Sequence, residues 1–312
     1  MTADINRLTK KKLSKRIMEN WQLYILILPA LVYLVIFAYG PMLGISIAFK
    51  DFKPHKGIFG SDWVGLKHFE RFFAMNKFKL AFKNTITLSL YSLIAGFPLP
   101  IILAMLLNSC PYLRLKKTVQ TVTYAPHFIS MVVIVGMLRV FFSPTTGLIG
   151  HILRAMGLID GPLMVLTDPG AFAHLYVWSG VWQGMGWSSI IYLGALTGVD
   201  PSLHESAVID GANKLQRILH IDLPAITPTI VVLLVLNCGS IMNVGFEKVF
   251  LLQNSLNLSA SETIATYVYK VGIQDSQYSF STAINLFNSV INFVLLIIVN
   301  SISRALGETA LW

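Results

Sequence analysis

Six stretches of the chain are apolar over lengths that would let a helix cross a lipid bilayer. A helix needs roughly 20 apolar residues to span the hydrocarbon core of a membrane. The stretches are Trp21–Ala48, Ala81–Leu107, Val119–Phe142, Ala171–Leu196, Thr229–Leu252 and Thr282–Ser303. This pattern predicts an all-α polytopic membrane protein with six transmembrane helices.

The composition supports this prediction and excludes other classes of protein. Of the 312 residues, 54% are hydrophobic and only 12% are charged, whereas soluble domains carry roughly 25% charged residues. Too few polar side chains remain to cover a water-soluble globule. The formal net charge of +9 is typical of basic residues that flank membrane spans and contact anionic lipid headgroups. We therefore expect the lipid bilayer as a partner, and no nucleic acid.

The charge pattern also bears on orientation. A basic segment, residues 1–20, precedes Trp21, and no small-residue cleavage site ends the first apolar stretch. Lys and Arg are equally numerous on the two sides of a six-span arrangement, so their total decides nothing. The basic flank of the first span usually dominates. We therefore expect residues 21–304 to form a membrane domain, with the N-terminal segment and the short tail 305–312 both cytoplasmic.

The first outer loop, at about residues 50–80, is rich in aromatic and basic residues. Leu66, Phe69 and Phe72 follow helical spacing. A short helix lying in the membrane interface accounts for this pattern. A docking surface for an extracellular partner is the alternative.

Motifs of enzymes and metal sites are absent from the sequence. It contains no phosphate-binding Gly-x-x-x-x-Gly-Lys-Ser/Thr loop, no His-Glu-x-x-His and no Gly-x-Ser-x-Gly. Its two cysteines, Cys110 and Cys238, do not have the spacing of metal ligands. We therefore expect no catalytic residues and no metal site in this chain.

Ionisable groups are scarce in the apolar stretches. Secondary transporters usually place such groups inside the membrane for coupling. Here Glu247 and Lys248 are adjacent and could neutralise each other or lie at the interface. If the protein moves a solute uphill, the energy is expected to come from another subunit.

The segment at about residues 197–228 contains the most structured polar sequence in the chain. Asp200 is a favourable N-cap, and Pro201 is a favourable first helical residue. A helix is expected to run to about Asp210, and Gly211 then supplies a stop or sharp turn. A second short helix is expected over Ala212–His220. Small residues would let another surface approach this loop closely.

This loop resembles a family signature. Glu205-Ser206-Ala207-x(3)-Gly211-x(9)-Ile221-x-Leu223-Pro224 is similar to the EAA motif of bacterial ATP-binding-cassette (ABC) importer permeases. The one departure is Ser206, where the motif has another small residue, Ala. The sequence Asp210-Gly211-Ala212 resembles the carbohydrate-uptake branch. Two further segments, Trp63–Phe69 and Tyr192–Leu196, are similar to segments of sugar permeases. Gly245–Glu247 and Asn300–Arg304 resemble the subgroup that takes up polysaccharide fragments or oligosaccharides.

The resemblance implies a type I ABC importer (MetI-like) permease fold in a bacterial plasma membrane, with the EAA loop in the cytoplasm. In this family the loop forms a coupling helix that fits a cleft on the ATPase. The implied coupling residues are Glu205, Ser206, Ala207, Asp210, Gly211, Ala212, Leu223 and Pro224. The implied partners are a second, homologous permease in a heterodimer, two cytoplasmic ATPase subunits and an extracellular solute-binding protein. ATP and Mg are expected on the ATPase, and no cofactor on this chain.

Polar and aromatic side chains within the apolar stretches are candidates for a substrate pathway. They are Trp178, Trp182, Gln183, Asn237, Asn243, Glu247, Asn285, Asn288 and Asn292. Amides are costly against lipid, so they either line a hydrated pathway or join helices by hydrogen bonds. Amides and indole rings suit a neutral polyhydroxyl ligand, and no cluster of Arg or Lys indicates an anionic one.

Two other classes of membrane protein are alternatives to the permease. A self-contained secondary carrier or channel would show inverted repeats and broken spans. Pro98 and Pro100 could break the second stretch, but they have no counterpart elsewhere. A membrane enzyme or sensor would need a catalytic constellation or a signalling domain. The sequence favours the permease and leaves the identity of the sugar open.

Overall fold

The computed structural model describes residues 19–305 and is almost entirely helical. The chain divides into two compact units, the first ending at Gly65 and the second beginning at Leu66. Two short strands, Lys50–Asp51 (β1) and Asp62–Trp63 (β2), pair antiparallel in the first unit. Lys50 lies opposite Trp63 in this pair.

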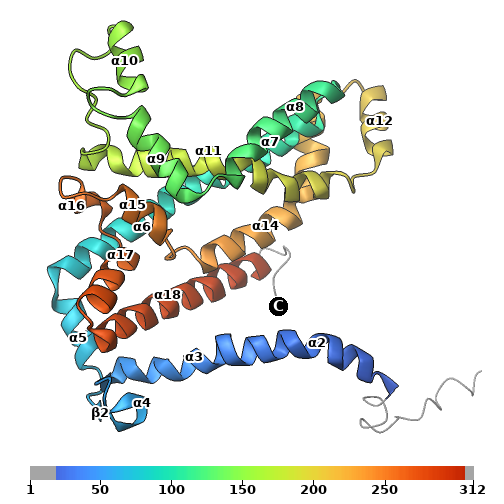
Figure 1. Cartoon of the computed structure of the whole chain (residues 1–312). Helices are drawn as coiled ribbons and strands as arrows, with labels where there is room; N and C mark the ends of the chain where they lie inside the picture. The colour runs from blue at the N-terminus through green and yellow to red at the C-terminus, as the bar shows by residue number, and fades with distance from the viewer. Residues whose placement is uncertain (1–18, 306–312) are drawn as a thin grey trace, which may run out of the picture. The chain divides into compact units, whose positions relative to one another are not determined.

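A continuous helical rod forms most of the first unit (Figure 1). It is built from α2 (Trp21–Leu34), a π-helical turn η1 (Val35–Tyr39), α3 (Gly40–Met42) and a 3-10 segment η2 (Leu43–Phe49). Together they make a candidate membrane span of 29 residues, Trp21–Phe49. This confirms a helix over the first predicted stretch. After β1, the short helix α4 (Gly57–Gly60) leads to β2, where the Trp63 ring stacks on Phe49 with centroids 5.6 Å apart.

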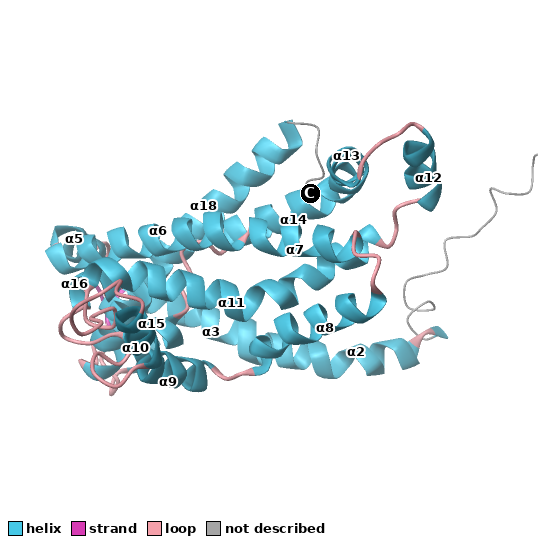
Figure 2. Cartoon of the chain, turned by 90° about the horizontal axis from the view of Figure 1, so that it is seen from above, coloured by secondary structure: helices cyan, strands magenta, loops and turns pink. Residues whose placement is uncertain are grey.

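The second unit is organised around α11 (Pro169–Leu196), which packs against α6 (Asn76–Gly96), α7 (Pro98–Asn108) and α8 (Leu113–Tyr124). A second pair, α14 (Leu223–Gly239) and α18 (Tyr278–Ala305), packs together (Figures 1 and 2). Two hydrophobic clusters hold these helices. The first surrounds Val135, Phe172 and Val249, and the second surrounds Ala104, Tyr192 and Ile226.

The remaining elements are short. They are α5 (Lys67–Ala74), η3 (Ala125–Phe128), α9 (Met131–Phe141), α10 (Leu148–Ala155), α12 (Pro201–Ile209), α13 (Lys214–Arg217), η4 (Ile218–Asp222), α15 (Phe246–Leu252), α16 (Leu258–Ser261), α17 (Ile264–Tyr269) and η5 (Lys270–Gln274). Within the second unit, α5, α10 and α16 lie at one end and α12 and α13 lie at the other (Figure 2).

Four helices of the described chain are long and apolar enough to cross a membrane, or five if a bent pair counts as one span. They are Trp21–Phe49, Asn76–Asn108, Lys214–Gly239 and Tyr278–Ala305. The helix α11 has 28 residues but is not one of the four, because its many Trp, Tyr, Ser and Gly residues lower its mean hydropathy. The prediction of a polytopic helical membrane protein is confirmed at this coarser level.

The third predicted stretch is not one straight helix, so the prediction over Val119–Phe142 is wrong in this respect. Its two parts, α8 with η3 and α9, meet at 101°. Pro126 has no backbone N–H to continue the helical ladder. Ser130 then starts α9 as its N-cap by accepting a hydrogen bond from the Val133 backbone N–H at 3.4 Å.

The fifth stretch also differs from its prediction. The apolar helix runs over Lys214–Gly239 rather than Thr229–Leu252, and a turn separates it from α15. A Cβ added at Gly239 would lie 2.6 Å from Leu296 Cδ1, so α14 and α18 approach closely there. The break falls where polar and small residues follow the apolar run.

The short helix predicted in the outer loop is confirmed as α5, but it does not simply lie on an interface. Phe72 is fully buried and its ring centroid lies 4.5 Å from that of Phe78 and 5.3 Å from that of Phe287 on α18. Arg71 lies over the Phe280 ring, with its guanidinium carbon 4.4 Å from the ring centroid. The aromatic cluster around Phe72 is therefore part of the packed second unit.

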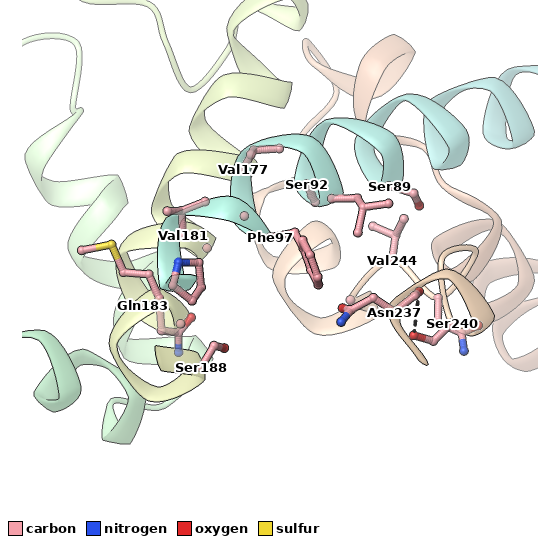
Figure 3. Close-up of a pocket in the computed structure, with 18 of the residues that line it drawn as sticks. Ser89, Ser92, Phe97, Val177, Val181, Gln183, Ser188, Asn237, Ser240 and Val244 are labelled. Atoms are coloured by element: carbon pink, nitrogen blue, oxygen red, sulfur yellow. Dashed lines mark hydrogen bonds between the residues drawn. The ribbon is translucent and has the colours of Figure 1, made fainter. Parts of the chain in front are cut away.

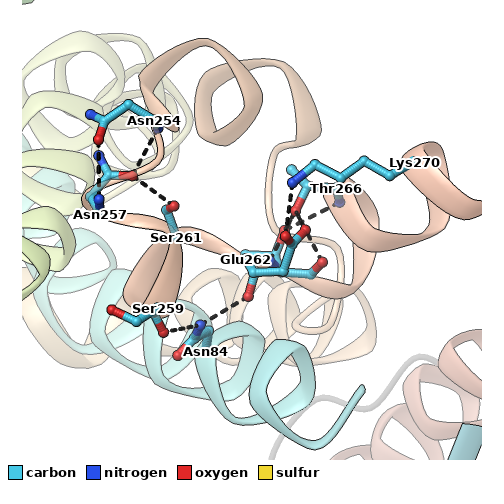
Figure 4. Close-up of polar contacts among 9 residues, drawn as sticks. Asn84, Asn254, Asn257, Ser259, Ser261, Glu262, Thr266 and Lys270 are labelled. Atoms are coloured by element: carbon cyan, nitrogen blue, oxygen red, sulfur yellow. Dashed lines mark hydrogen bonds and ion pairs between the residues drawn. The ribbon is translucent and has the colours of Figure 1, made fainter. Parts of the chain in front are cut away.

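Polar contacts fix the end of the unit that contains α16 and α17 (Figure 4). Asn84 on α6 donates to the Glu262 carbonyl at 2.9 Å. The Glu262 carboxylate forms an ion pair with Lys270 at 2.8 Å. Asn257 donates to the Leu166 carbonyl at 3.0 Å. These contacts hold the segment after α15 against α6 and against the loop that precedes α11.

Candidate functional site

A cavity of about 710 Å³ opens between α6, α7, α11, α14 and α15. Polar side chains from several of these helices lie around it, interspersed with apolar ones such as Phe97 and Val181 (Figure 3). The polar lining includes Ser89, Ser92, Gln183, Ser188, Asn237 and Ser240. The cavity is therefore amphipathic and large enough for several sugar units.

Four of the nine predicted pathway residues line this cavity: Gln183, Asn237, Asn243 and Glu247. The Gln183 amide donates to the Ile129 carbonyl at 3.2 Å, in the bend between α8 and α9. The Asn237 amide donates to the Leu233 carbonyl one turn earlier at 2.7 Å. Each amide retains its carbonyl oxygen as an acceptor for a ligand hydroxyl.

Two of the three predicted asparagines on α18 join helices by hydrogen bonds. Asn288 and Asn292 donate to the Asn243 side-chain oxygen at 3.3 Å and 3.1 Å. The Asn292 side-chain oxygen in turn accepts the Met242 backbone N–H at 3.0 Å. These amides join α18 to the turn after α14. Asn285 is exposed and does not line the cavity. Asn243 therefore combines both roles that the sequence left open.

The two tryptophans face elsewhere. Trp178 and Trp182 line a second, apolar cavity of about 510 Å³ between α9 and α11. The Trp178 indole N–H donates to the Tyr91 hydroxyl at 2.8 Å, and this hydroxyl lies 2.8 Å from His174 Nδ1. The structure thus separates these rings from the amide-lined cavity, because they project from a different face of α11 than Gln183.

Lys248 is a cavity residue that sequence reasoning did not identify as a pathway candidate. Its side chain is buried, with 4% of its surface exposed, whereas the neighbouring Glu247 is exposed. The two side chains form no ion pair with each other. Mutual neutralisation, one of the two alternatives for this pair, therefore does not occur, since consecutive helical residues point in different directions. A lysine that begins the apolar run of α15 was the available signal.

The EAA-like loop has the local structure that its sequence predicts. The Asp200 carboxylate accepts the Ser202 backbone N–H at 2.9 Å and begins α12. Hydrogen bonds from the backbone and side chain of Ser202 lower the pKa of this carboxyl group. The helix ends at Ile209, and Gly211 takes a left-handed φ of 80°. Such a conformation favours glycine because other residues are strained there.

The second helix of the loop is not a separate element. Asn213 and Gln216 form a capping box that begins α13. The helix then runs without a break through η4 into α14. The expected short helix over Ala212–His220 is therefore largely the first turns of a membrane-spanning helix. Only a few loop residues connect α12 to this helix, so a movement of α12 would be transmitted to it directly.

The predicted coupling residues lie in two groups. Glu205, Ser206, Asp210 and Gly211 are exposed, and Ala207 and Ala212 are half-buried. Leu223 and Pro224 lie in the first turn of α14, rather than on the loop itself. Apolar side chains on α12 are also exposed, Ile209 by 86%. An exposed helix with apolar side chains and small residues is suited to docking against another protein.

Asp222 connects this loop to the helices and was not identified from the sequence. Its carboxylate is buried, lies 3.3 Å from His204 Nε2 on α12, and accepts from Asn108 Nδ2 on α7 at 3.4 Å. A polar cavity of about 240 Å³ surrounds these groups, lined also by Lys214 and Arg217. Asp222 therefore connects α12 to α7, whose Asn108 lies 114 residues earlier in the sequence.

Comparison with known proteins gives the context of this geometry. Residues 96–308 match the family model described as "Binding-protein-dependent transport system inner membrane component". The chain belongs to this family of ABC importer permeases. The match spans the EAA-like loop and the cavity helices from α7 onward, and it confirms the assignment made from the loop.

Two curated relatives of this permease come from Bacillus subtilis (strain 168). The polygalacturonan/rhamnogalacturonan transport system permease protein YteP is 42% identical over 303 residues, covering 97% of this chain and 94% of YteP. Protein LplB is 41% identical over 294 residues, covering 94% of this chain and 92% of LplB.

Two solved structures resemble this permease over almost its whole length. One is a bacterial ABC transporter involved in the import of the acidic polysaccharide alginate, with a TM-score of 0.87 and 40% identity over 95% of this chain and 99% of that chain. The other is a bacterial alginate ABC transporter in complex with an alginate pentasaccharide-bound periplasmic protein. Its TM-score is 0.89, with 39% identity over 96% of this chain and 100% of that chain.

Proposed function

We propose that this permease forms half of the translocation pathway of an ABC importer for oligosaccharides. The observation that carries the proposal is the cavity of about 710 Å³, lined by amides and hydroxyls, in a chain of this family. The name of YteP and the titles of the alginate transporter structures support a carbohydrate fragment as the solute. Sugar hydroxyls exchange hydrogen bonds with amides such as Gln183, Asn237 and Asn243.

The six-span count is part of this proposal. The four long apolar helices account for four spans. The bent pair of α8 and α9 and the 28-residue α11 would supply the other two. The bend of 101° suits a chain that turns at a water-filled pathway, because irregular backbone within a membrane is tolerated where protein or a cavity surrounds it.

We further propose that α12 docks against a cytoplasmic ATPase and that Glu205, Ala207 and Gly211 contribute to this contact. Glu205 is exposed for a polar contact, while the small residues allow close approach. ATP and Mg would bind to the ATPase, so this chain itself would be no enzyme. Docking shifts the equilibrium of the permease only if the contacts differ between its two states. The continuity of α13, η4 and α14 offers a rigid route for that shift.

The complete assembly would contain a second, related permease, two ATPase subunits and an external binding protein. The alginate transporter structure with its periplasmic protein supports the last of these. In this arrangement both termini and α12 would lie in the cytoplasm, while α4, α5 and the segment of α15 to α17 would face outward. The outer loop would then be available for docking of the binding protein.

Uptake by the reconstituted complex tests the proposal. The complex is placed in proteoliposomes with ATP inside, and binding protein with a labelled oligosaccharide is added outside. Oligogalacturonides and cello-oligosaccharides serve as acidic and neutral probes. We expect accumulation that requires both ATP and the binding protein. Uptake driven by an ion gradient without ATP would instead support the secondary carrier.

Cysteine labelling tests the orientation. Lys56→Cys and Arg114→Cys are introduced singly after Cys110 and Cys238 have been replaced by serine, and both positions are exposed and lie outside α12. A membrane-impermeant maleimide should label position 56 in intact cells and position 114 only after permeabilisation. The reverse pattern would overturn the proposed orientation.

A further inference from the structure

Lys248 provides a buried cation in the proposed translocation cavity. Its side chain is 4% exposed, and it lines the cavity together with Tyr176 and Gly180 of α11. Within residues 19–305, no carboxylate forms an ion pair with its ammonium group. Burying an unpaired charge is costly. A buried ammonium group without a paired carboxylate is therefore expected to have a role other than packing.

The surroundings of Lys248 hold its ammonium group in place without neutralising it. The Nζ atom donates to the Tyr176 carbonyl at 2.8 Å and lies 4.9 Å from the centroid of the Tyr176 ring. A Cβ at Gly180 would lie only 3.2 Å from Nζ, so the missing side chain leaves room for it. One carbonyl uses one of the three ammonium donors. The remaining donors are available to a ligand in the cavity.

The chemistry of the cavity then indicates the ligand. Gln183, Asn237 and Asn243 supply amides for hydroxyl groups, and Lys248 supplies a single positive charge. Glu247 also lines the cavity, but it is exposed, so water screens its charge. A pyranose with several hydroxyls and one carboxylate satisfies both kinds of group. The acidic character of alginate and the galacturonate units of polygalacturonan agree with this choice.

We propose that Lys248 binds the carboxylate of a uronic acid unit in the transported oligosaccharide. This inference rests on the proposed function and specifies its substrate as acidic. It differs from the expectation of a neutral ligand, which rested on the absence of an Arg or Lys cluster. One ammonium suffices because the Lys248 side chain is itself buried, and charge-assisted hydrogen bonds to a buried group are stronger than in bulk water.

Uptake of paired probes tests this role. Proteoliposomes with the complete transporter and its binding protein receive tetragalacturonate or its fully methyl-esterified form, which keeps the hydroxyl groups and replaces each charged carboxylate with a neutral methyl ester. For each probe, the rate of the Lys248→Met variant is divided by the wild-type rate. The affinity of the binding protein cancels in this ratio, because the variant changes only the permease. The Lys248→Arg variant tests whether a positive charge at this position is enough for uptake of the acid. Lys117→Met, at an exposed position on α8 outside the cavity, is the matched control.

We expect Lys248→Met to lower uptake of tetragalacturonate by about tenfold, the effect of one charge-assisted hydrogen bond. Uptake of the ester should change by less than about twofold on the same scale, and Lys248→Arg should retain most uptake of the acid. An equal fall for both probes would overturn the proposal and leave Lys248 as a structural tie between α15 and α11. Wild-type transport of neutral probes alone would also overturn it, although the importer function would stand.

Discussion

Replacement of Asp222 by alanine should uncouple ATP hydrolysis from transport. The buried Asp222 carboxylate faces His204 of α12 at 3.3 Å and Asn108 of α7 at 3.4 Å. Both contacts are long, and the His204 side chain is 26% exposed, so water can replace part of what is lost. We therefore place the loss at the low end for charged hydrogen bonds, about 1–2 kcal/mol.

The lost free energy weakens the contact that holds α12 in place against the membrane helices. A loss of about 1–2 kcal/mol reduces the population of molecules in which α12 stays in contact with the membrane helices by roughly 5- to 30-fold. The ATPase would still bind and hydrolyse ATP, but its conformational change would move α14 in a smaller fraction of the cycles. We expect the number of solutes imported per ATP to fall by about fivefold or more, with a much smaller change in basal ATP hydrolysis.

The measurement is the ratio of uptake to ATP hydrolysis in the same proteoliposomes, for Asp222→Ala, His204→Ala and the double variant. If the two residues act through each other, the double variant should resemble the worse single variant. Asp222→Asn, which keeps the shape and one acceptor oxygen, should be intermediate. An unchanged ratio in Asp222→Ala, with normal assembly, would refute the reasoning.

Three further changes give separate tests. Gly186→Ala places a Cβ 2.1 Å from the Thr123 carbonyl oxygen, so it should destabilise the α8–α11 contact by about 1–3 kcal/mol and lower the melting temperature of the purified complex. Gly136→Ala, where a Cβ meets nothing within 4 Å, is its control, and equal melting temperatures would contradict the packing. Ala207→Trp should abolish ATP-coupled uptake while membrane insertion persists; unchanged uptake would argue against docking through α12. Asn243→Leu should reduce uptake while the complex still assembles, whereas a defect in assembly alone would assign Asn243 to helix packing.

The features that local sequence determines were predicted well. The apolar length of residues 21–48 and 282–303 places helices there, and both occur with slightly wider bounds. In the EAA-like loop, capping by Asp200 and the turn at Gly211 depend only on neighbouring residues. The spacing of the motif then identified the family, which the match over residues 96–308 confirms.

The failures have two sources: local breaks that hydropathy does not register, and contacts between distant segments. Hydropathy does not distinguish a straight span from the bent pair of α8 and α9, although Pro126 marks the bend. The burial of Lys248 depends on the open space at Gly180, on a different helix. The role of Asp222 requires His204 and Asn108 to come together. None of these contacts has a periodic signature in the sequence.

The composition of the native complex tests the central claim most directly. The permease is purified from its membrane through a tag on this chain, and the intact assembly is weighed by native mass spectrometry. The account predicts one copy of this chain, one related permease that carries its own EAA motif, and two ATPase subunits. A transport-competent assembly that contains only copies of this chain, without any ATPase, would contradict it.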